Sequence, residues 1–504
     1  MAGYADNLRD RPDHVAVRCG DDARTYRELH HRASRLASVL RGLGLSAGDR
    51  LAIMLPNSVE FVECLAASAK LECAALTVNW HLAPDELAHV LGDSGAGVLV
   101  AHADLRDVVD AAAPGCPVLL VGAGADDATD YESALAGAAD EDLPSTWPTS
   151  WPVVYTSGTT GRPKGVVHGA LASAEVLDMT QTMLAGLWGY GPEDVHVVAG
   201  PLYHAGPQGY ANLTLFVGGT VVVMPEWDAR GFCRTVQEQG VTTTFLTPAH
   251  FIRFLEVPEE ERAAYDLGSL RHVLHAGAPC PRTVKERMIA ALPGAEIWEI
   301  YGMSEGGATR VSAAEWSARP GTVGLPWPGT EIRILEPDTL EQVGPGETGL
   351  VYVRPAHGRF HYHGDEGKTA GAWHDDAFTV GDVGHLDEDG WLFLTDRRVD
   401  MVIKGGVNVY PRSVEEVLHR HPAVVDCAVF GVPHERDGEH LHAVVELREP
   451  TDPEELVRFT RANLDPWSCP STVEVVDRLP RDPNGKVLKR QLRAAAWADA
   501  GRSI

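Results

Sequence analysis

A run of glycine and hydroxyl-bearing residues, YTSGTTGRPKG from Tyr155 to Gly165, has the residue types that bind phosphate. Glycines let the backbone approach an anion closely, and amide and hydroxyl groups can donate hydrogen bonds to phosphate oxygens. An apolar pair precedes the run, which predicts a strand, a loop and a helix in succession. The residues expected to bind phosphate are Thr156, Ser157, Gly158, Thr159, Thr160, Gly161 and Lys164.

This loop alone does not identify a function. It lacks the G-x-x-x-x-G-K-[ST] spacing of a Walker loop, and loops of this composition are more often plain turns. Further short motifs follow it along the chain, in this order: PLYH (201–204), HAGAP (275–279), EIYGMSE (299–305), FTVGD (378–382), TDRRVDMVIKGG (395–406) and PNGK (483–486).

The ordered set resembles the adenylate-forming superfamily of acyl-CoA synthetases, luciferases and peptide-synthetase adenylation domains. The resemblance spans about Thr25 to Arg493, and the run FHYHGDEGKTA (360–370) is most similar to fatty-acyl and aryl acyl-CoA synthetases. It implies a ligase that uses ATP and Mg²⁺ to convert a small-molecule carboxylic acid into an acyl-adenylate with release of pyrophosphate. The acyl group then passes to an acceptor, expected to be CoA, and AMP leaves.

The resemblance assigns the nucleotide contacts to particular residues. Tyr301 would stack on the adenine, Asp382 would accept hydrogen bonds from both ribose hydroxyls, and Ser304 would bond the α-phosphate. Glu305, with Thr156, would hold Mg²⁺, which offsets the phosphate charge. The other residues implied in ATP binding are Gly277, Ala278, Pro279, Glu299, Gly302, Met303 and Arg397.

Catalysis of the first step is implied for Lys486, Lys164 and His204. A carboxylate that attacks the α-phosphate brings two anions together, so cations must neutralise the growing charge and hold an in-line geometry. Lys486 lies in a Pro-Asn-Gly turn, where an isolated lysine would ordinarily be solvated. His204 would orient the acid at the α-phosphate, although a lone histidine at the end of a strand is more often structural.

The second step needs a moving domain and a path for the acceptor. Arg398, Val399 and Asp400 correspond to the hinge, and Lys404, Gly405 and Gly406 to the path for pantetheine. The family usually has a charged residue at the position of Val399. Cationic and aromatic contacts to the CoA nucleotide are thinned out, because Asp437 and Ser468 stand where such residues are typical.

These departures leave other readings open. One is a non-CoA acceptor in natural-product biosynthesis, as in amine ligases or in diazotases that use ATP and nitrite on an arylamine. Another is a nucleotide-binding sensor without catalysis, which the joint presence of Lys164, Glu305, Asp382, Arg397 and Lys486 disfavours. The histidine pairs 361/363 and 440/442 could share a metal, but the sequence indicates no third ligand for either pair.

The identity of the acid is poorly constrained. Residues 205–209, 245–251 and 309–311 should supply walls of its pocket. Arg310 is unusual there, and if it faces the pocket it could pair with a second carboxylate on the substrate. An exposed surface arginine is the alternative. The sequence does not indicate an oligomeric state.

Apolar runs that alternate with helical patterns must position these motifs. Residues 195–198, 220–224, 241–246, 272–275 and 297–300 read as strands separated by helices, which predicts an α/β fold with helix-covered parallel sheets. Close-set strands after Glu331 predict a smaller β-rich subdomain. We expect a large domain over residues 1–396, the hinge at 397–400, and a small C-terminal α/β domain over 401–504 that carries Lys486.

Composition excludes other classes of function. The 504 residues include 43 basic and 71 acidic side chains, and a net charge of −28 would repel a nucleic-acid backbone. The sequence contains no run of about 18 apolar residues that would predict a membrane span, and its N-terminal part does not resemble a signal peptide. Eight scattered cysteines lack metal-ligand or disulfide spacing. A cytoplasmic protein is therefore expected.

Overall fold

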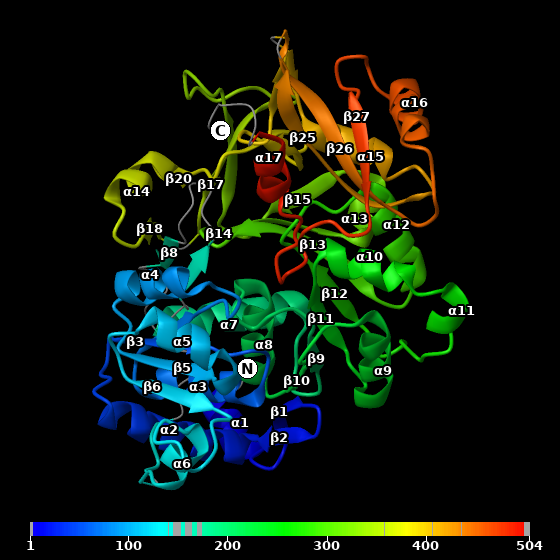
Figure 1. The fold of residues 1–504 in the computed structure, drawn as a ribbon. Helices are drawn as coiled ribbons and strands as arrows, with labels where there is room; N and C mark the ends of the chain where they lie inside the picture. The colour runs from blue at the N-terminus through cyan, green and yellow to red at the C-terminus, as the bar shows by residue number, and fades with distance from the viewer. Residues whose placement is uncertain are drawn as a thin grey trace.

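The computed structural model describes residues 4–139, 141–144, 153–156, 164–168, 174–356, 358–405, 407–434 and 436–497. Figure 1 shows two helix-covered sheets in the lower part of the molecule and a smaller sheet, drawn in orange, at the top. Among the described residues, no helix combines the length and apolarity that a membrane crossing requires. Phosphate-loop residues 157–161 and the acceptor-path residue Gly406 lie outside the described residues, so their predicted roles stay predictions.

The first sheet has a parallel centre and an antiparallel edge. Its strand order is β18-β8-β7-β4-β3-β5-β6, of which β7, β4, β3, β5 and β6 are parallel. Helices α2 to α6 connect and cover these strands. The bounds are β3 Arg50–Met54, β4 Ala74–Thr77, β5 Val98–His102, β6 Val118–Val121, β7 Val153–Thr156, β8 Lys164–His168, β18 Phe360–Tyr362, α2 Tyr26–Gly42, α3 Val59–Lys70, α4 Pro84–Ser94, α5 Arg106–Ala112 and α6 Tyr131–Ala136.

The second sheet has a parallel half in the order β1-β10-β9-β11-β12-β13, with β2 paired antiparallel on β1. The expected strands 195–198, 220–224, 241–246, 272–275 and 297–300 all lie in this half. Its bounds are β1 Val15–Cys19, β2 Asp22–Thr25, β9 Val195–Val198, β10 Thr220–Val223, β11 Thr243–Leu246, β12 His272–His275, β13 Glu296–Met303, α1 Tyr4–Asp10, α7 Ala174–Trp188, α8 Ala205–Val217, α9 Ala229–Gln239, α10 Pro248–Glu256, α11 Glu259–Arg262 and α12 Arg282–Ala291.

The β-rich part after Glu331 is hydrogen-bonded onto this sheet. Antiparallel pairing continues from β13 through β14, β15, β22, β21 and β17 to β16 and β20, so the expected subdomain and the parallel half form one continuous ladder. The bounds are β14 Gly306–Ser312, α13 Ala313–Ala318, β15 Thr322–Pro326, β16 Glu331–Leu335, β17 Gly349–Arg354, α14 Glu366–Ala372, β19 Trp373–His374, β20 Ala377–Phe378, β21 Asp382–Leu386 and β22 Leu392–Arg397.

The third sheet uses only strands that follow Asp400, in the order β24-β23-β26-β25 with β27 parallel to β26. As the sequence predicts, Asp452 caps α16, and its side chain accepts a hydrogen bond from the backbone N–H of Glu454. The bounds are β23 Val402–Lys404, β24 Val407–Val409, α15 Pro411–Leu418, β25 Val424–His434, β26 Gly438–Leu447, α16 Pro453–Asn463, β27 Thr472–Val476 and α17 Lys489–Trp497. The division at residues 397–400 stays a prediction.

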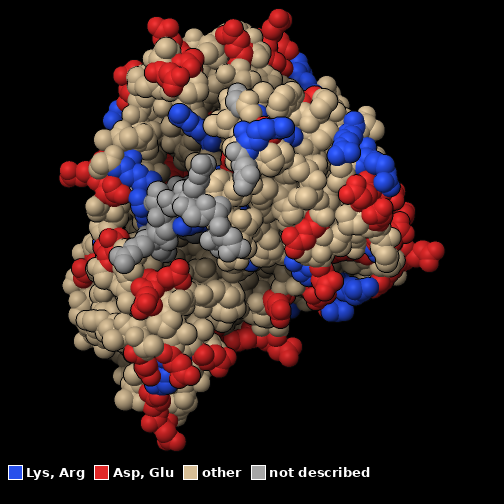
Figure 2. All heavy atoms as spheres, turned by 45° about the horizontal axis from the view of Figure 1, so that its top comes forward, with Lys and Arg blue, Asp and Glu red and all other residues tan. Residues whose placement is uncertain are grey.

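Acidic side chains are more widespread than basic ones on the visible face of the molecule (Figure 2). Figure 2 shows them spread around the visible face, whereas lysine and arginine side chains form a few separate groups. This distribution follows from the excess of 71 acidic over 43 basic residues. It gives the visible face no extended basic stripe of the kind that binds nucleic acid.

Candidate functional site

The predicted ribose acceptor Asp382 is the centre of a small hydrogen-bond network. Asp382 begins β21 and is the register partner of Arg397 at the end of β22. Its two carboxylate oxygens accept hydrogen bonds from Tyr301 Oη at 2.7 Å and from Arg397 Nε at 3.1 Å. Burial, and then the neighbouring Asp382 carboxylate, raise the pKa of Tyr301, so the phenol stays protonated as a donor. The network fixes the predicted adenine-stacking ring and the ribose acceptor relative to each other.

The turn between β13 and β14 carries the predicted phosphate and metal contacts. His168 Nε2 lies 2.8 Å from the backbone oxygen of Ser304 and donates to it, which holds the turn against β8. Glu305 Oε1 accepts a hydrogen bond of 2.7 Å from Tyr362 Oη. A Cβ on Gly302 would lie 3.2 Å from the Cα of Gly307, so this position favours glycine.

The strand β18 brings a second set of side chains to the phosphate loop. It pairs antiparallel with β8, and Tyr362 lies opposite Val166. Asp365 follows this strand, and its carboxylate lies 3.0 Å from Lys164 Nζ. The run 360–370 indicated only a likeness to a subfamily, and neither Tyr362 nor Asp365 was predicted as a site residue. The hydroxyl of Tyr362 and the carboxylate of Asp365 are polar groups within that run that could have indicated a role in the site.

The loop that carries Lys486 lies against the large domain. Thr247 Oγ1 donates a hydrogen bond of 3.1 Å to the backbone oxygen of Asn484, and a Cβ on Gly485 would lie 2.5 Å from Ala249 Cβ. Figure 1 shows the corresponding red segment, which precedes α17, descending beside β13. Three segments far apart in the chain, 247–249, 382–397 and 484–486, therefore meet at one place.

Lys486 lies close enough to the predicted ribose contacts, Arg397 and Asp382, for their charges to shift its pKa. Desolvation and then the positive charge of Arg397 lower the pKa of Lys486, while Asp482, Asp400 and Asp382 oppose that shift. Asp482 Oδ1 accepts a hydrogen bond of 2.8 Å from the backbone N–H of Lys486, which closes the turn. The structure thus brings the predicted catalytic lysine to the predicted nucleotide contacts.

Glu299 has a buried partner. Its carboxylate lies 2.6 Å from Lys285 Nζ, and the Lys285 side chain is 0% exposed. Burial opposes ionisation of Glu299, but Lys285 overcomes that cost and keeps its pKa below the ordinary value. Lys285 also lies 4.8 Å from the ring centroid of Trp316. The pair anchors β13, which carries Tyr301, against α12.

His204 is the N-cap residue of α8 and is deeply placed. Burial lowers its pKa to about 4, so the ring is neutral near pH 7. Its ring lies 4.5 Å from that of Tyr203, and Nε2 has no hydrogen-bond partner among the described residues. A neutral ring suits the predicted role of orienting an acid, because it can donate one hydrogen bond without a full charge.

An aromatic cluster lies on the other side of β13 from the ribose network. Side chains alternate between the two faces of a strand, so Tyr301 and Ile300 point to opposite sides. Ile300 and Trp298 pack in a buried group between α7, α8, β11 and β12. We call its rings the aromatic cluster, which consists of Trp188, Tyr190, Tyr210, Phe216, Phe245, Trp298 and Trp327. A Cβ on Gly206 would lie 2.5 Å from the Phe245 ring, so any larger residue at this position would clash with the cluster.

The predicted hinge is linked to both domains. Arg398 donates a backbone hydrogen bond to the Gly381 carbonyl, and Arg493 on α17 donates one of 3.2 Å to the Val399 carbonyl. The Val399 side chain is 57% exposed, so this unusual hinge residue makes little packing contact. The hinge role of residues 398–400 stays a prediction.

In the predicted acceptor path, the Lys404 side chain is already hydrogen-bonded within the protein. Lys404 Nζ is buried and donates to the backbone oxygen of Trp467 at 3.0 Å and of Cys469 at 3.4 Å, so it fastens the loop 465–469. Asp437, which stands where the family tends to have a cation or an aromatic residue, lies 2.8 Å from His440 and 3.2 Å from Arg436.

The two histidine pairs do not act as pairs. His440 stacks on His434 at 3.5 Å, with Asp437 beside both, whereas His442 bonds Thr472 instead. His363 Nε2 donates a hydrogen bond of 2.9 Å to the backbone oxygen of Asp93 on α4. The i, i+2 spacing along a strand therefore did not predict which residues these histidines contact.

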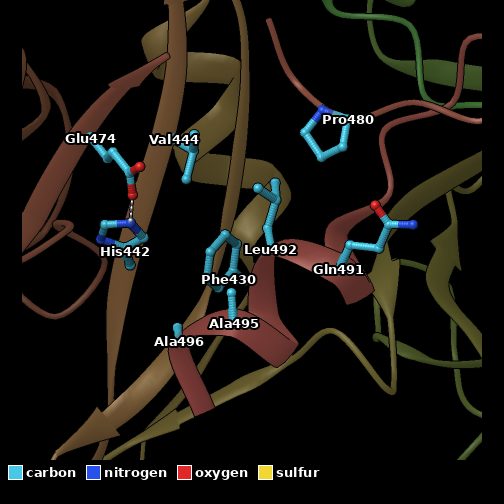
Figure 3. A pocket seen from close by; sticks show the side chains of 9 residues that line it. All are labelled: Phe430, His442, Val444, Glu474, Pro480, Gln491, Leu492, Ala495 and Ala496. Carbon is cyan, nitrogen blue, oxygen red and sulfur yellow. Dashed lines mark hydrogen bonds and ion pairs between the residues drawn. The ribbon is translucent and has the colours of Figure 1, made fainter. Parts of the chain in front are cut away.

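A groove of about 400 Å³ lies on the small domain. Figure 3 shows its lining residues, which come from β25, β26 and α17 with Glu474 and Pro480 at the edge. Most of them are apolar, and His442 lies 3.4 Å from the Glu474 carboxylate on one side of the groove (Figure 3). None of the predicted site residues lines it.

Comparison with known proteins places this geometry in context. The family model "AMP-binding enzyme" matches residues 4–358, and "AMP-binding enzyme C-terminal domain" matches residues 413–486. A feruloyl-CoA synthase of Amycolatopsis sp is 37% identical, with 96% of each chain covered. A fatty acid–[acyl-carrier-protein] ligase, ScoC of Streptomyces coeruleorubidus, is 33% identical over 99% of this chain and 96% of its own.

Solved structures agree with these matches. The amide bond synthetase McbA from Marinactinospora thermotolerans superposes with a TM-score of 0.85 at 28% identity, covering 98% of this chain and 99% of its own. The predicted fold class, a large helix-covered α/β domain with a smaller C-terminal one, is confirmed. The resemblance on which the site assignments rest is confirmed as well.

Proposed function

Because this chain belongs to the AMP-binding enzyme family and is therefore an adenylate-forming ligase, we propose that it activates an aromatic carboxylic acid with ATP and transfers the acyl group to CoA. The observation that supports this most is the docked loop 482–486. Thr247 holds it at the Asn484 carbonyl, and Lys486 thereby lies beside Arg397 and Asp382. A soluble, cytoplasmic setting would suit these substrates.

In the first step, an oxygen of the substrate carboxylate attacks the α-phosphorus of ATP. A bond forms between that oxygen and phosphorus, and the bond from phosphorus to the bridging oxygen of pyrophosphate breaks. Lys486 neutralises charge at the α-phosphate as it develops, while Asp382 and Tyr301 hold the nucleoside. Neutral His204 donates a hydrogen bond that orients the attacking carboxylate.

The residues present fit a bound Mg²⁺. Glu305 offers a carboxylate oxygen, the ligand type that this ion prefers, and Tyr362 orients that carboxylate from the side. When bound, Mg²⁺ would offset the charge of the phosphates. Lys164, which pairs with Asp365 in this structure, would add a second cation on the phosphate side.

In the second step, the acceptor thiol attacks the acyl carbon of the adenylate. The new carbon–sulfur bond replaces the carbon–oxygen bond, AMP leaves, and the thiol proton passes to solvent. The small domain must rotate about residues 398–400 to remove the Lys486 loop and present the acceptor face. That rotation breaks the hydrogen bond between Thr247 and Asn484.

An amine acceptor is the second candidate. Asp437 places a carboxylate on the face expected to hold the phosphates of CoA, and Arg436 and His440 are already engaged with it. A phosphate-rich acceptor is bound less well by such a surface. The amide bond synthetase among the structural neighbours has this overall architecture.

Pyrophosphate release from ATP tests the first step, with a panel of aryl and fatty acids and with nitrite plus arylamines. We expect an aryl acid to be the best substrate. Lys486→Ala should lower pyrophosphate release by about 10²–10³-fold, since it removes one preorganised cation at the transition state. Arg490→Ala is the control, because that exposed cation follows four residues later and contacts none of the site residues named above.

Product mass spectrometry with and without CoA, and with amines, tests the second step. A thioester that forms only with CoA supports the leading proposal. An amide formed without CoA would replace the acceptor and leave the first step standing, whereas a diazo product would replace the carboxylic acid of the first step by nitrite. Unchanged pyrophosphate release from Lys486→Ala would overturn the assignment of the catalytic lysine.

A further inference from the structure

Arg310 is a half-buried cation with no acidic partner. It lies on β14 opposite Ile300, and its guanidinium carbon is 5.2 Å from the ring centroid of Trp298 and 5.9 Å from that of Trp188. Within the described part of the chain, no carboxylate forms an ion pair with it. By contrast, the half-buried Arg253 and Arg481 both reach the Glu446 carboxylate. Charges removed from water are normally paired, so Arg310 calls for a partner.

The aromatic cluster around Arg310 adjoins the nucleotide contacts. Ile300 precedes Tyr301, and Ala276, which packs on the cluster, precedes Gly277. Phe245 lies two residues before Thr247, which holds the Lys486 loop. Tyr210 belongs to the cluster and lies on α8, the helix that His204 caps. A molecule in contact with the cluster would therefore lie next to the place where the acid meets the α-phosphate.

The cluster contains several buried polar groups without a hydrogen-bond partner among the described residues. They are the indole nitrogens of Trp188, Trp298 and Trp327 and the hydroxyl of Tyr190. The three indole N–H groups can only donate and the hydroxyl can also donate, while no residue of the cluster carries a carboxylate. Buried donors without acceptors destabilise the fold, so such a group is best explained by a ligand that supplies acceptors. The flat indole faces favour an aromatic body for that ligand.

On the basis of the proposed acid activation, we propose that this chain selects aromatic acids that bear a second carboxylate, and that Arg310 binds that second carboxylate. The guanidinium offers a planar fork that matches a carboxylate, and the Trp188 and Trp298 rings hold it in place by cation–π contact. His204 and Lys486 then act on the first carboxylate. Arg310 determines specificity and takes no part in the bond changes.

Matched substrate pairs test this inference. Cinnamic acid is compared with 4-carboxycinnamic acid, and benzoic acid with terephthalic acid, by kcat/KM for pyrophosphate release. The wild-type protein should prefer the dicarboxylate by about 100-fold, because a charged, bidentate contact discriminates strongly against an analogue that lacks the group. Arg310→Met should abolish the preference through a rise in KM for the dicarboxylate, and should leave the monocarboxylate rate near that of the wild type.

Arg310→Lys and Arg230→Met complete the design. Lysine keeps the charge but loses the fork, so it should retain part of the preference. Arg230 is an exposed arginine paired with Glu261, and its replacement should change neither rate. Circular dichroism checks that each variant is folded. If Arg310→Met does not fold, the inference is tested by the ratio of kcat/KM for the dicarboxylate and the monocarboxylate in the wild-type protein and in Arg310→Lys.

The outcomes separate this inference from the proposed function. A wild-type protein that prefers monocarboxylates, or an Arg310→Lys or Arg310→Met variant with an unchanged ratio, overturns the inference and leaves the ligase assignment intact. Pyrophosphate release from no acid at all overturns the choice of acid as substrate. In that case nitrite with 3-aminocinnamic acid is the remaining pair to measure.

Discussion

The two sides of β13 differ in how their polar groups are satisfied. On the proposed nucleotide side, two carboxylates have protein partners: Asp382 has Tyr301 and Arg397, and Glu299 has Lys285. On the proposed acid side, the Arg310 guanidinium lies over indole rings, and the indole N–H groups of Trp298 and Trp327 have no acceptor among the residues that the structure describes. The nucleotide side is thus preorganised by internal bonds for a ligand that does not vary. The acid side leaves its donors open, so the ligand itself must satisfy them.

The largest effect should follow from breaking the buried ion pair beneath the nucleotide side. Lys285→Met keeps the approximate shape of the side chain but leaves the Glu299 carboxylate buried without a cation. Removal of one partner of a buried pair costs about 3–5 kcal/mol of unfolding free energy. Urea denaturation followed by tryptophan fluorescence measures it.

Two further variants sharpen that measurement. The double variant Lys285→Met with Glu299→Gln removes both charges and should recover most of the loss. Arg230→Ala breaks the exposed pair with Glu261 and should leave the urea midpoint close to that of the wild type. A Lys285→Met midpoint that matches the exposed control would show that the nucleotide side does not depend on its internal pairing.

The next effect concerns the ribose network. Asp382→Asn removes the charge that holds Arg397 and leaves one side-chain oxygen to serve two ribose hydroxyls. We expect the KM for ATP to rise about 30- to 100-fold, because two charge-assisted hydrogen bonds weaken. The KM for the acid should stay unchanged, since Asp382 lies across β13 from the aromatic cluster. Steady-state pyrophosphate release with each substrate varied in turn gives both KM values. An equal rise in the KM for ATP and the KM for the acid would contradict the division between the two sides of β13.

A smaller effect is expected at the proposed metal ligand. Tyr362→Phe removes the hydrogen bond of 2.7 Å to Glu305 and changes nothing else in the shape of the ring. The concentration of Mg²⁺ at half-maximal rate should rise about tenfold, in line with losing one bond that orients a ligating carboxylate. Titration of Mg²⁺ at saturating ATP and acid measures this, with thermal unfolding as the check on folding. Excess Mg²⁺ should restore the rate.

The smallest effect contrasts two tryptophans. Trp327→Phe removes an N–H group that has no acceptor among the described residues, whereas Trp497→Phe removes one that donates to the Gly431 carbonyl at 2.9 Å. Both lose ring area, but only the second breaks a hydrogen bond. The loss of unfolding free energy should therefore be about 1 kcal/mol larger for Trp497→Phe. An equal or larger loss for Trp327→Phe would mean that its indole is already satisfied.

Sequence patterns predicted the repeated elements well because their causes are local. The parallel strands 195–198 and 272–275 are short, β-branched or apolar runs interrupted only by histidine, and the cap at Asp452 follows from its side chain and the next proline. The ordered motifs indicated the nucleotide residues, and the structure brings Asp382, Arg397, Tyr301 and Lys486 to one place. The small β-rich subdomain after Glu331 was also predicted, and the structure adds that β15 joins it to the large sheet.

Pairings between distant segments could not be predicted in the same way. The bond between Tyr362 and Glu305 spans 57 residues and depends on how β18 reaches β8. The Lys285–Glu299 pair joins a helix to a strand through packing that no motif contains. The position of Arg310 against two indoles likewise depends on α7, which lies more than one hundred residues earlier. Such contacts follow from topology rather than from local pattern.

With Lys164 in its proposed role as a phosphate contact, its ion pair with Asp365 would make nucleotide binding an exchange of counterions. An arriving triphosphate would displace the Asp365 carboxylate from Lys164, which lies 3.0 Å away. Dissolved salt screens the phosphate and the carboxylate alike, so it weakens the ligand and its internal competitor together. We expect the affinity for ATP to decline less steeply with ionic strength than the charge of the nucleotide alone would give. The protein would thereby keep a steadier occupancy in cells whose salt content changes.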